Sequence, residues 1–92
     1  PSEGKEIASI PEVSIEQVNE AVAAAVAAFP SWARLTPKDR SLVLLKIADT
    51  IEQNQEVFAS LESENCGKPY SAMLNDEMPA VVDVFRFFAG AC

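Results

Sequence analysis

The chain has 92 residues, of which 49% are hydrophobic, and its formal net charge is −7. A chain of this length buries only about 60 to 65% of the surface of its unfolded form, so its own core must be small. Its seven basic residues are scattered, which excludes the clustered Lys and Arg of a nucleic-acid or anionic-membrane surface. The longest apolar run, residues 21–30, is far shorter than the roughly 20 residues that cross a bilayer.

Two cysteines, Cys66 and Cys92, are present, too few for the disulfide framework of a small secreted domain. No secretory signal pattern opens the chain. We therefore expect reduced thiols and a cytoplasmic protein. The chain starts at Pro1 without an initiator Met and ends directly after an apolar stretch, so we expect both ends to be cut from a longer protein.

The first 30 residues predict a strand and a helix. Residues 5–10 alternate polar and apolar side chains before Pro11, which is typical of a short edge strand, although its partner is not evident in this chain. Ser14 with Gln17 forms a capping-box pattern. Apolar residues then recur at helical spacing, which predicts a helix over 15–29 closed by Pro30. The apolar positions are Ile15, Val18, Ala21, Val22, Ala25 and Phe29.

Two further helices are expected in the middle of the chain. After a short segment in which Trp32 is interpreted as a packing anchor, Thr36 caps a helix with Pro37 at its first position. Its apolar stripe contains Leu44, Ile47, Ala48 and Ile51. Asn54 is expected to cap the next helix, which carries Val57, Phe58 and Leu61 and ends at Gly67.

A last helix is expected to begin after Asn75 as its cap, with Asp76 and Glu77 in its first turn and Pro79 early enough to be tolerated. Its apolar positions are Val81, Val82, Phe85, Phe88 and Ala89. The connections are short throughout. The predicted fold class is therefore mainly α, with four to five helices and a short N-terminal edge strand, and with no domain boundary inside residues 1–92.

Few residues invite a catalytic interpretation. The chain has no His, which removes the commonest general base and metal ligand, and its three Gly do not build a phosphate loop. Cys66 lies at a helix carboxyl end, where the negative end of the dipole disfavours a thiolate. The acidic pairs Glu62 with Glu64 and Asp76 with Glu77 are interpreted as a solvated face and as helix-capping acids. Without family knowledge the residues do not name a reaction.

Several motifs in one order resemble the start of the aldehyde dehydrogenase superfamily, and together they span essentially the whole chain. The first motif is residues 1–4, a trace of an Asn-Pro-Ala-Thr-Gly opening. The others, in chain order, are Ala21–Ala33 with Phe-Pro-Ser-Trp-Ala, Thr-Pro-x-x-Arg at 36–40, Leu44–Ile51, Gly67–Pro69 and Asp83–Gly90. Within the superfamily, Asn65–Pro69 followed by Asn75–Gly90 is similar to the aminoaldehyde branch, near 4-aminobutyraldehyde and betaine aldehyde dehydrogenases.

The resemblance implies that residues 1–92 are the N-terminal part of the α/β cofactor-binding domain of an NAD-dependent homo-oligomer, a dimer or tetramer. Such an enzyme oxidises an aldehyde to a carboxylic acid through a catalytic Cys and a Glu that activates water. In the family these residues and the NAD-binding loop come later in the chain. Neither Cys66 nor Cys92 inherits the nucleophile's role, and the resemblance assigns no catalytic or cofactor-binding residue here.

Some members of the superfamily bind a structural monovalent cation near this region, and Glu77 matches the acid of that site. The alternative interpretation of Glu77 is a helix-capping acid. For the chain as a whole, the alternative from another class of protein is an autonomous acidic helical module that binds a protein partner. Such a module should fold cooperatively on its own, whereas a part of a larger enzyme should expose an apolar face.

Overall fold

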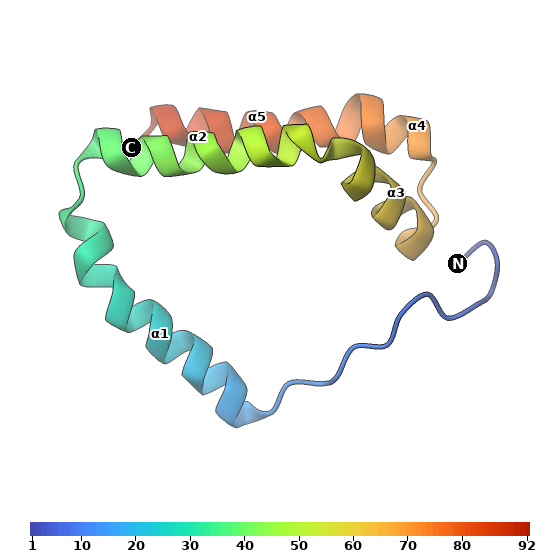
Figure 1. The fold of residues 1–92 in the computed structure, drawn as a ribbon, viewed down its shortest axis with the longest axis horizontal. Helices are drawn as coiled ribbons and strands as arrows, with labels where there is room; N and C mark the ends of the chain where they lie inside the picture. Colours follow the sequence, from blue (N-terminus) through green and yellow to red (C-terminus); the bar gives the residue numbers. More distant parts are fainter.

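The structure, a computed structural model, describes residues 1–92 and contains helices and no strand. The elements in chain order are α1 (Ile15–Arg34), α2 (Pro37–Gln53), α3 (Gln55–Cys66), the short α4 (Tyr70–Ala72), the π-helical turn η1 (Met73–Glu77) and α5 (Met78–Gly90). Figure 1 shows α5 alongside α2, α3 turning away from the end of α2, and α1 diverging from its beginning. The expectation of a mainly helical chain is confirmed.

The predicted edge strand over residues 5–10 is wrong. Residues 5–14 form no regular secondary structure, and no backbone hydrogen bond involves residues 5–13. A strand exists only through a ladder of hydrogen bonds to a neighbouring strand. Because the rest of this chain is helical, the alternating side chains of residues 5–10 have no such neighbour, and the segment runs as an extended tail toward α3 (Figure 1).

The core lies where α5 packs against α2. Ala48 on α2 and Val82 and Ala89 on α5 are buried, as their positions in the sequence predicted. A second buried cluster joins Ala59 of α3 to Met73 and Met78, with Ile51 and Leu74 packed against it. Alanines at these positions let the helix backbones approach closely, while flexible Met side chains fill the remaining space.

An ion-pair bridge reinforces the contact between α2 and α5. The Arg86 guanidinium donates to Asp49 Oδ1 at 3.1 Å and to Glu52 Oε2 at 3.0 Å. The two acceptors are three residues apart and so lie on one face of α2. Their hydrogen bonds, that of Glu52 above all, raise the pKa of Arg86 above its ordinary value. All three side chains remain largely solvent-exposed, so the bridge orients the helices more than it stabilises them.

The first helix is longer than predicted. We expected Pro30 to close it, but α1 continues through Pro30 to Arg34, and Trp32 lies inside it. Pro30 removes the hydrogen bond to the Val26 carbonyl without ending the helix. Just beyond it, Ser31 Oγ donates to the Ala28 carbonyl oxygen at 2.8 Å. The interpretation of Trp32 as a packing anchor is not supported, since its side chain is 37% exposed.

The last helix also begins earlier than predicted. Asn75 does not cap it, because α4, η1 and α5 form one continuous helix from Tyr70 to Gly90. Pro79 explains the π-helical turn, since a proline ring in a regular α-helix clashes with the carbonyl four residues before it, here that of Asn75. Within η1 the Met78 N–H donates to the carbonyl of Met73, five residues back. The widened turn thus accommodates Pro79 inside the helix.

Apart from Asn75, local caps were predicted well, with the exception of Asn54. In the capping box, the Ser14 N–H donates to Gln17 Oε1 at 2.8 Å and the Gln17 N–H donates to Ser14 Oγ at 3.2 Å. Thr36 Oγ1 accepts from the Asp39 N–H, and Gly67 ends α3 in the left-handed conformation, with φ of 78°. Asn54 does not cap α3 with its side chain. Its Nδ2 instead donates back to the Thr50 carbonyl.

The arrangement is open. The radius of gyration is 17.1 Å, whereas a compact domain of this length has about 12 Å. The accessible surface is 7189 Å², against about 5,200 Å² for a compact chain of this mass. The excess of roughly 2,000 Å² is comparable to the area buried in a permanent protein interface.

Much of the exposed surface is apolar. Every residue of α1 is exposed, including the apolar stripe of α1, which is defined here as Ile15, Val18, Ala21, Val22, Ala25 and Phe29. Phe58, Leu61 and Val57 of α3 are also exposed, contrary to the burial that their spacing suggested. No helix is both long enough and apolar enough to span a membrane.

Val82 provides a test of the α2–α5 core. It is 1% exposed, so Val82→Ala should lower the free energy of unfolding by about 2 kcal/mol through lost burial and a new cavity. Urea unfolding followed by helical circular dichroism would measure this. Val84→Ala on the same helix is the control, since Val84 is 54% exposed. Equal effects of the two substitutions would contradict the assignment of the core.

Candidate functional site

A cluster of three charged side chains lies where the chain reverses between α3 and η1. The Lys68 Nζ donates to Glu77 Oε2 at 2.7 Å and lies 3.8 Å from Glu62 Oε1. Gly67 makes this approach possible, because its positive φ ends α3 and turns the backbone back toward η1. Ser63 Oγ holds the turn by donating to the Lys68 carbonyl at 2.6 Å.

The two carboxylates shift the protonation equilibrium of Lys68. The hydrogen bond to Glu77, then the charge of Glu77, raises the pKa of Lys68 above its ordinary value of 10.5. The three side chains are 42 to 46% exposed, so solvent screens the attraction strongly. Lys68 is therefore a firmly protonated ammonium that neutralises Glu77, and it is not poised as a base.

Two roles were expected for Glu77, a ligand of a monovalent cation and a helix-capping acid, and the structure contradicts the second. It makes no capping hydrogen bond to the backbone of α5, because it lies inside a continuous helix, so the interpretation as a helix-capping acid is wrong. Its carboxylate is engaged by Lys68. No group of three or more acidic, Cys or His side chains that could hold a metal ion is present.

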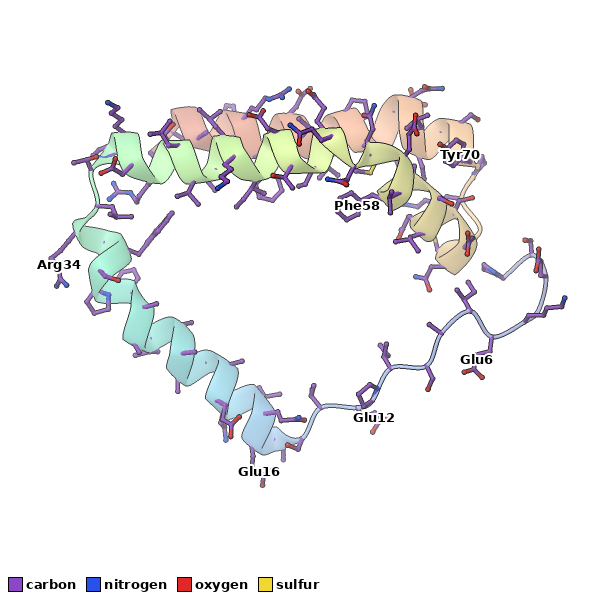
Figure 2. The ribbon with its side chains drawn as sticks, viewed as in Figure 1. Glu6, Glu12, Glu16, Arg34, Phe58 and Tyr70 are labelled. Carbon is purple, nitrogen blue, oxygen red and sulfur yellow. The ribbon has the colours of Figure 1, made fainter.

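A shallow apolar groove adjoins this ion-pair cluster. It encloses about 330 Å³ and has Glu62 and Glu77 at its polar edge. The rest of its lining is apolar, from Ile51, Phe58, Met73, Met78 and Val81. In Figure 2 the labelled Phe58 side chain points away from α3 into the space that α1, α2 and the N-terminal tail surround.

The two thiols are exposed and free. Cys66 Sγ donates to the Glu62 carbonyl at 3.1 Å, and Cys92 Sγ donates to the Phe88 carbonyl at 3.4 Å. Each thiol thus bonds to a carbonyl at a helix carboxyl end, where the dipole opposes formation of a thiolate. Cys66 Sγ also lies 3.4 Å from Glu62 Oε1, the carboxylate oxygen that is 3.8 Å from the Lys68 ammonium.

The other predicted acidic pairs are not brought together as a catalytic site. Glu64 accepts a long hydrogen bond from Ser60 Oγ at 3.4 Å, and Asp76 is exposed. Sequence reasoning missed Lys68 as the centre of the Glu62 and Glu77 cluster. The Gly67–Pro69 turn was the available signal, since a chain reversal brings residues before and after it into proximity.

The sequence matches the family described as "Aldehyde dehydrogenase family" over residues 1–92. It is 43% identical over 90 residues to "Acetaldehyde dehydrogenase" of Pseudomonas aeruginosa, covering 98% of this chain and 18% of that protein. It is 43% identical over 91 residues to "2-aminomuconic semialdehyde dehydrogenase" of Danio rerio, covering 99% and 19%. It is 41% identical over 92 residues to "Aldehyde dehydrogenase family 2 member B4, mitochondrial" of Arabidopsis thaliana, covering 98% and 17%.

These matches run along nearly the whole chain, and the chain belongs to the aldehyde dehydrogenase family. The resemblance inferred from its motifs is thereby confirmed at the level of the family. The chain spans less than a fifth of the length of these curated relatives.

The ion-pair cluster predicts an ordered set of pKa changes. Glu77→Gln should lower the pKa of Lys68 toward 10.5, and Glu62→Gln should lower it less, because its carboxylate is 3.8 Å away. NMR titration of the Lys68 side chain would measure both shifts, with exposed Glu56→Gln as control. The stabilising contribution should be complete below pH 10.5 and disappear as the pH rises through the raised pKa. A larger effect of Glu62→Gln would contradict the geometry.

Proposed function

We propose that this chain is the N-terminal part of a longer NAD(P)-dependent aldehyde dehydrogenase that oxidises an aldehyde to the carboxylic acid. The observation that carries the proposal is the family match over residues 1–92, combined with coverage of only 17 to 19% of the relatives' lengths. In such an enzyme NAD(P) accepts the hydride of the oxidised aldehyde. The chain would form part of the cofactor-binding domain.

The contribution of these residues would be structural. Thiolate attack and hydride transfer need a nucleophile, an oxyanion donor and a cofactor face held in line. Cys66 and Cys92 donate to helix carbonyls, and the chain has no His. We therefore place the nucleophile, its base and the cofactor loop outside residues 1–92.

The exposed apolar surfaces support a partner within the same enzyme. Figure 2 shows the Glu16 and Arg34 side chains on the outer side of α1. At about 100° per residue, Val18 and Val22 lie at least about 120° around the helix from Glu16. The apolar stripe of α1 therefore faces the space that α1, α2 and the N-terminal tail surround, into which Phe58 also points. We propose that the remainder of the longer protein packs against the apolar stripe of α1. We also propose that the longer protein is a homo-oligomer in the cytoplasm.

For the substrate we propose an aminoaldehyde such as 4-aminobutanal. The support is the segment Asn65–Pro69 followed by Asn75–Gly90, which is similar to the aminoaldehyde branch. Two of the relatives carry other substrates in their names, acetaldehyde and 2-aminomuconic semialdehyde. These aldehydes are therefore the necessary comparison in any assay.

An activity assay tests the enzyme and its substrate separately. The native protein should be isolated with an antibody raised against this chain, and its mass should be several times 9.9 kDa. NADH formation should then be highest with 4-aminobutanal, and lower with betaine aldehyde and acetaldehyde, while the 92-residue chain alone should form none. A preference for acetaldehyde would contradict the substrate but not the enzyme. An inactive native product of 9.9 kDa would contradict the enzyme and favour the helical interaction module.

A monovalent cation at Glu77 stays a prediction for the longer protein. Within this chain the Glu77 carboxylate already accepts from Lys68 at 2.7 Å, so other segments would have to supply the remaining ligands and displace the ammonium. If the cation binds there, potassium should raise the melting temperature relative to tetramethylammonium, and Glu77→Gln should abolish the difference. Equal melting temperatures of the unsubstituted protein in the two salts would remove the cation from the proposal.

A further inference from the structure

The connection between α1 and α2 is a two-residue elbow, Leu35 and Thr36. Both residues are extended, with ψ of 149° and 154°. No residue of α1 is buried, so packing against the other helices of this chain does little to direct α1. The conformation of the elbow therefore determines where α1 points.

Thr36 is fixed from the side of α2. It precedes Pro37, and steric contact with a following proline ring excludes the helical region for such a residue. Its Oγ1 also accepts the N–H of Asp39 at 3.1 Å as the cap of α2. Leu35 has neither constraint. Its N–H donates to the Trp32 carbonyl at 3.1 Å, but its own carbonyl accepts no backbone N–H.

Arg40 supplies a constraint on Leu35. From the first turn of α2, its guanidinium Nη1 donates to the Leu35 carbonyl at 2.5 Å and lies 3.5 Å from the Ala33 carbonyl oxygen. Carbonyls at a helix carboxyl end lack intrahelical donors and carry the negative end of the dipole, so a cation is favoured there. The side chain of α2 thus holds the end of α1 and the elbow together.

We propose that Arg40 is a positioning residue that sets the direction of α1 relative to α2. It thereby presents the apolar stripe of α1 toward the side on which Phe58 lies. This inference rests on the proposed function, because the surface that the stripe meets belongs to the remainder of the longer protein. A residue that merely caps α1 would stabilise the last turn and leave the rest of the helix unaffected.

Hydrogen exchange along α1 in the longer protein separates positioning from capping. Arg40→Met should speed amide exchange over the whole of Ile15–Arg34 by about tenfold, the loss expected for one hydrogen bond to a charged group. Arg34→Met is the matched control, since Arg34 is exposed and in the last turn of the same helix. It removes the same charge and should alter exchange only within the last turn of α1.

Faster exchange confined to residues 33–36, or an equal effect of Arg34→Met, would overturn the proposal. If Arg40→Met does not yield folded protein, Arg40→Lys decides, because the lysine nitrogen lies one bond nearer the backbone than Nη1, the single nitrogen that reaches both carbonyls. It should speed exchange over the whole of α1, by less than tenfold, and a wild-type pattern would overturn the proposal. NADH formation by the unsubstituted protein is measured in parallel, so that failure of the proposed function is recognised independently of the exchange pattern.

Discussion

The contact between α2 and α5 is the constraint on which the remaining arrangement depends. Ala48, Val82 and Ala89 are buried there, and the small alanine side chains allow the two backbones to approach closely. Arg86 then orients the pair by bonding two carboxylates of α2. Because α2 leads into α3 and η1 leads into α5, this contact also places the Met73 and Met78 cluster against Ala59.

Away from that contact, the chain buries too few apolar side chains to form a complete hydrophobic core. Hydrophobic burial must offset the loss of conformational entropy for every ordered residue. Only six of 92 residues are buried, and the surface exceeds that of a compact chain by roughly 2,000 Å². The helices are nevertheless specified by caps and spacing. Two curated relatives are about five times longer than this chain, and under the proposed function segments beyond residues 1–92 would cover these apolar faces.

The sequence predicted those features that depend on neighbouring residues. The capping box at Ser14, the cap at Thr36 and the stop at Gly67 each arise within a few residues, and all three are present. The strand over residues 5–10 was wrong because pairing needs a distant partner. Two helix boundaries, the end at Pro30 and the start at Asn75, were wrong for another reason. Pro30 and Pro79 both lie inside continuous helices, the latter through a π-helical turn, and a proline alone does not decide whether a helix ends or continues past it.

For the candidate site the same distinction holds. Glu77 was recognised from its place in a motif, but its partner Lys68 was not, because their contact requires the chain reversal at Gly67 and the continuity of η1 with α5. An ion pair across nine positions follows from the path of the backbone. Helical spacing within one element does not predict it.

Two of the motifs that connect this chain to its family coincide with joints of the structure. The motif at residues 36–40 contains Thr36 of the elbow and Arg40, which bonds to it, and Gly67 and Lys68 form the reversal before η1. These residues determine directions of helices rather than contacts with a substrate. Relatives named for two different aldehydes are each 43% identical to this chain, as expected if residues 1–92 specify an architecture common to both. Differences in substrate would then arise in segments that this architecture supports, and the motifs of this chain would keep those segments in place.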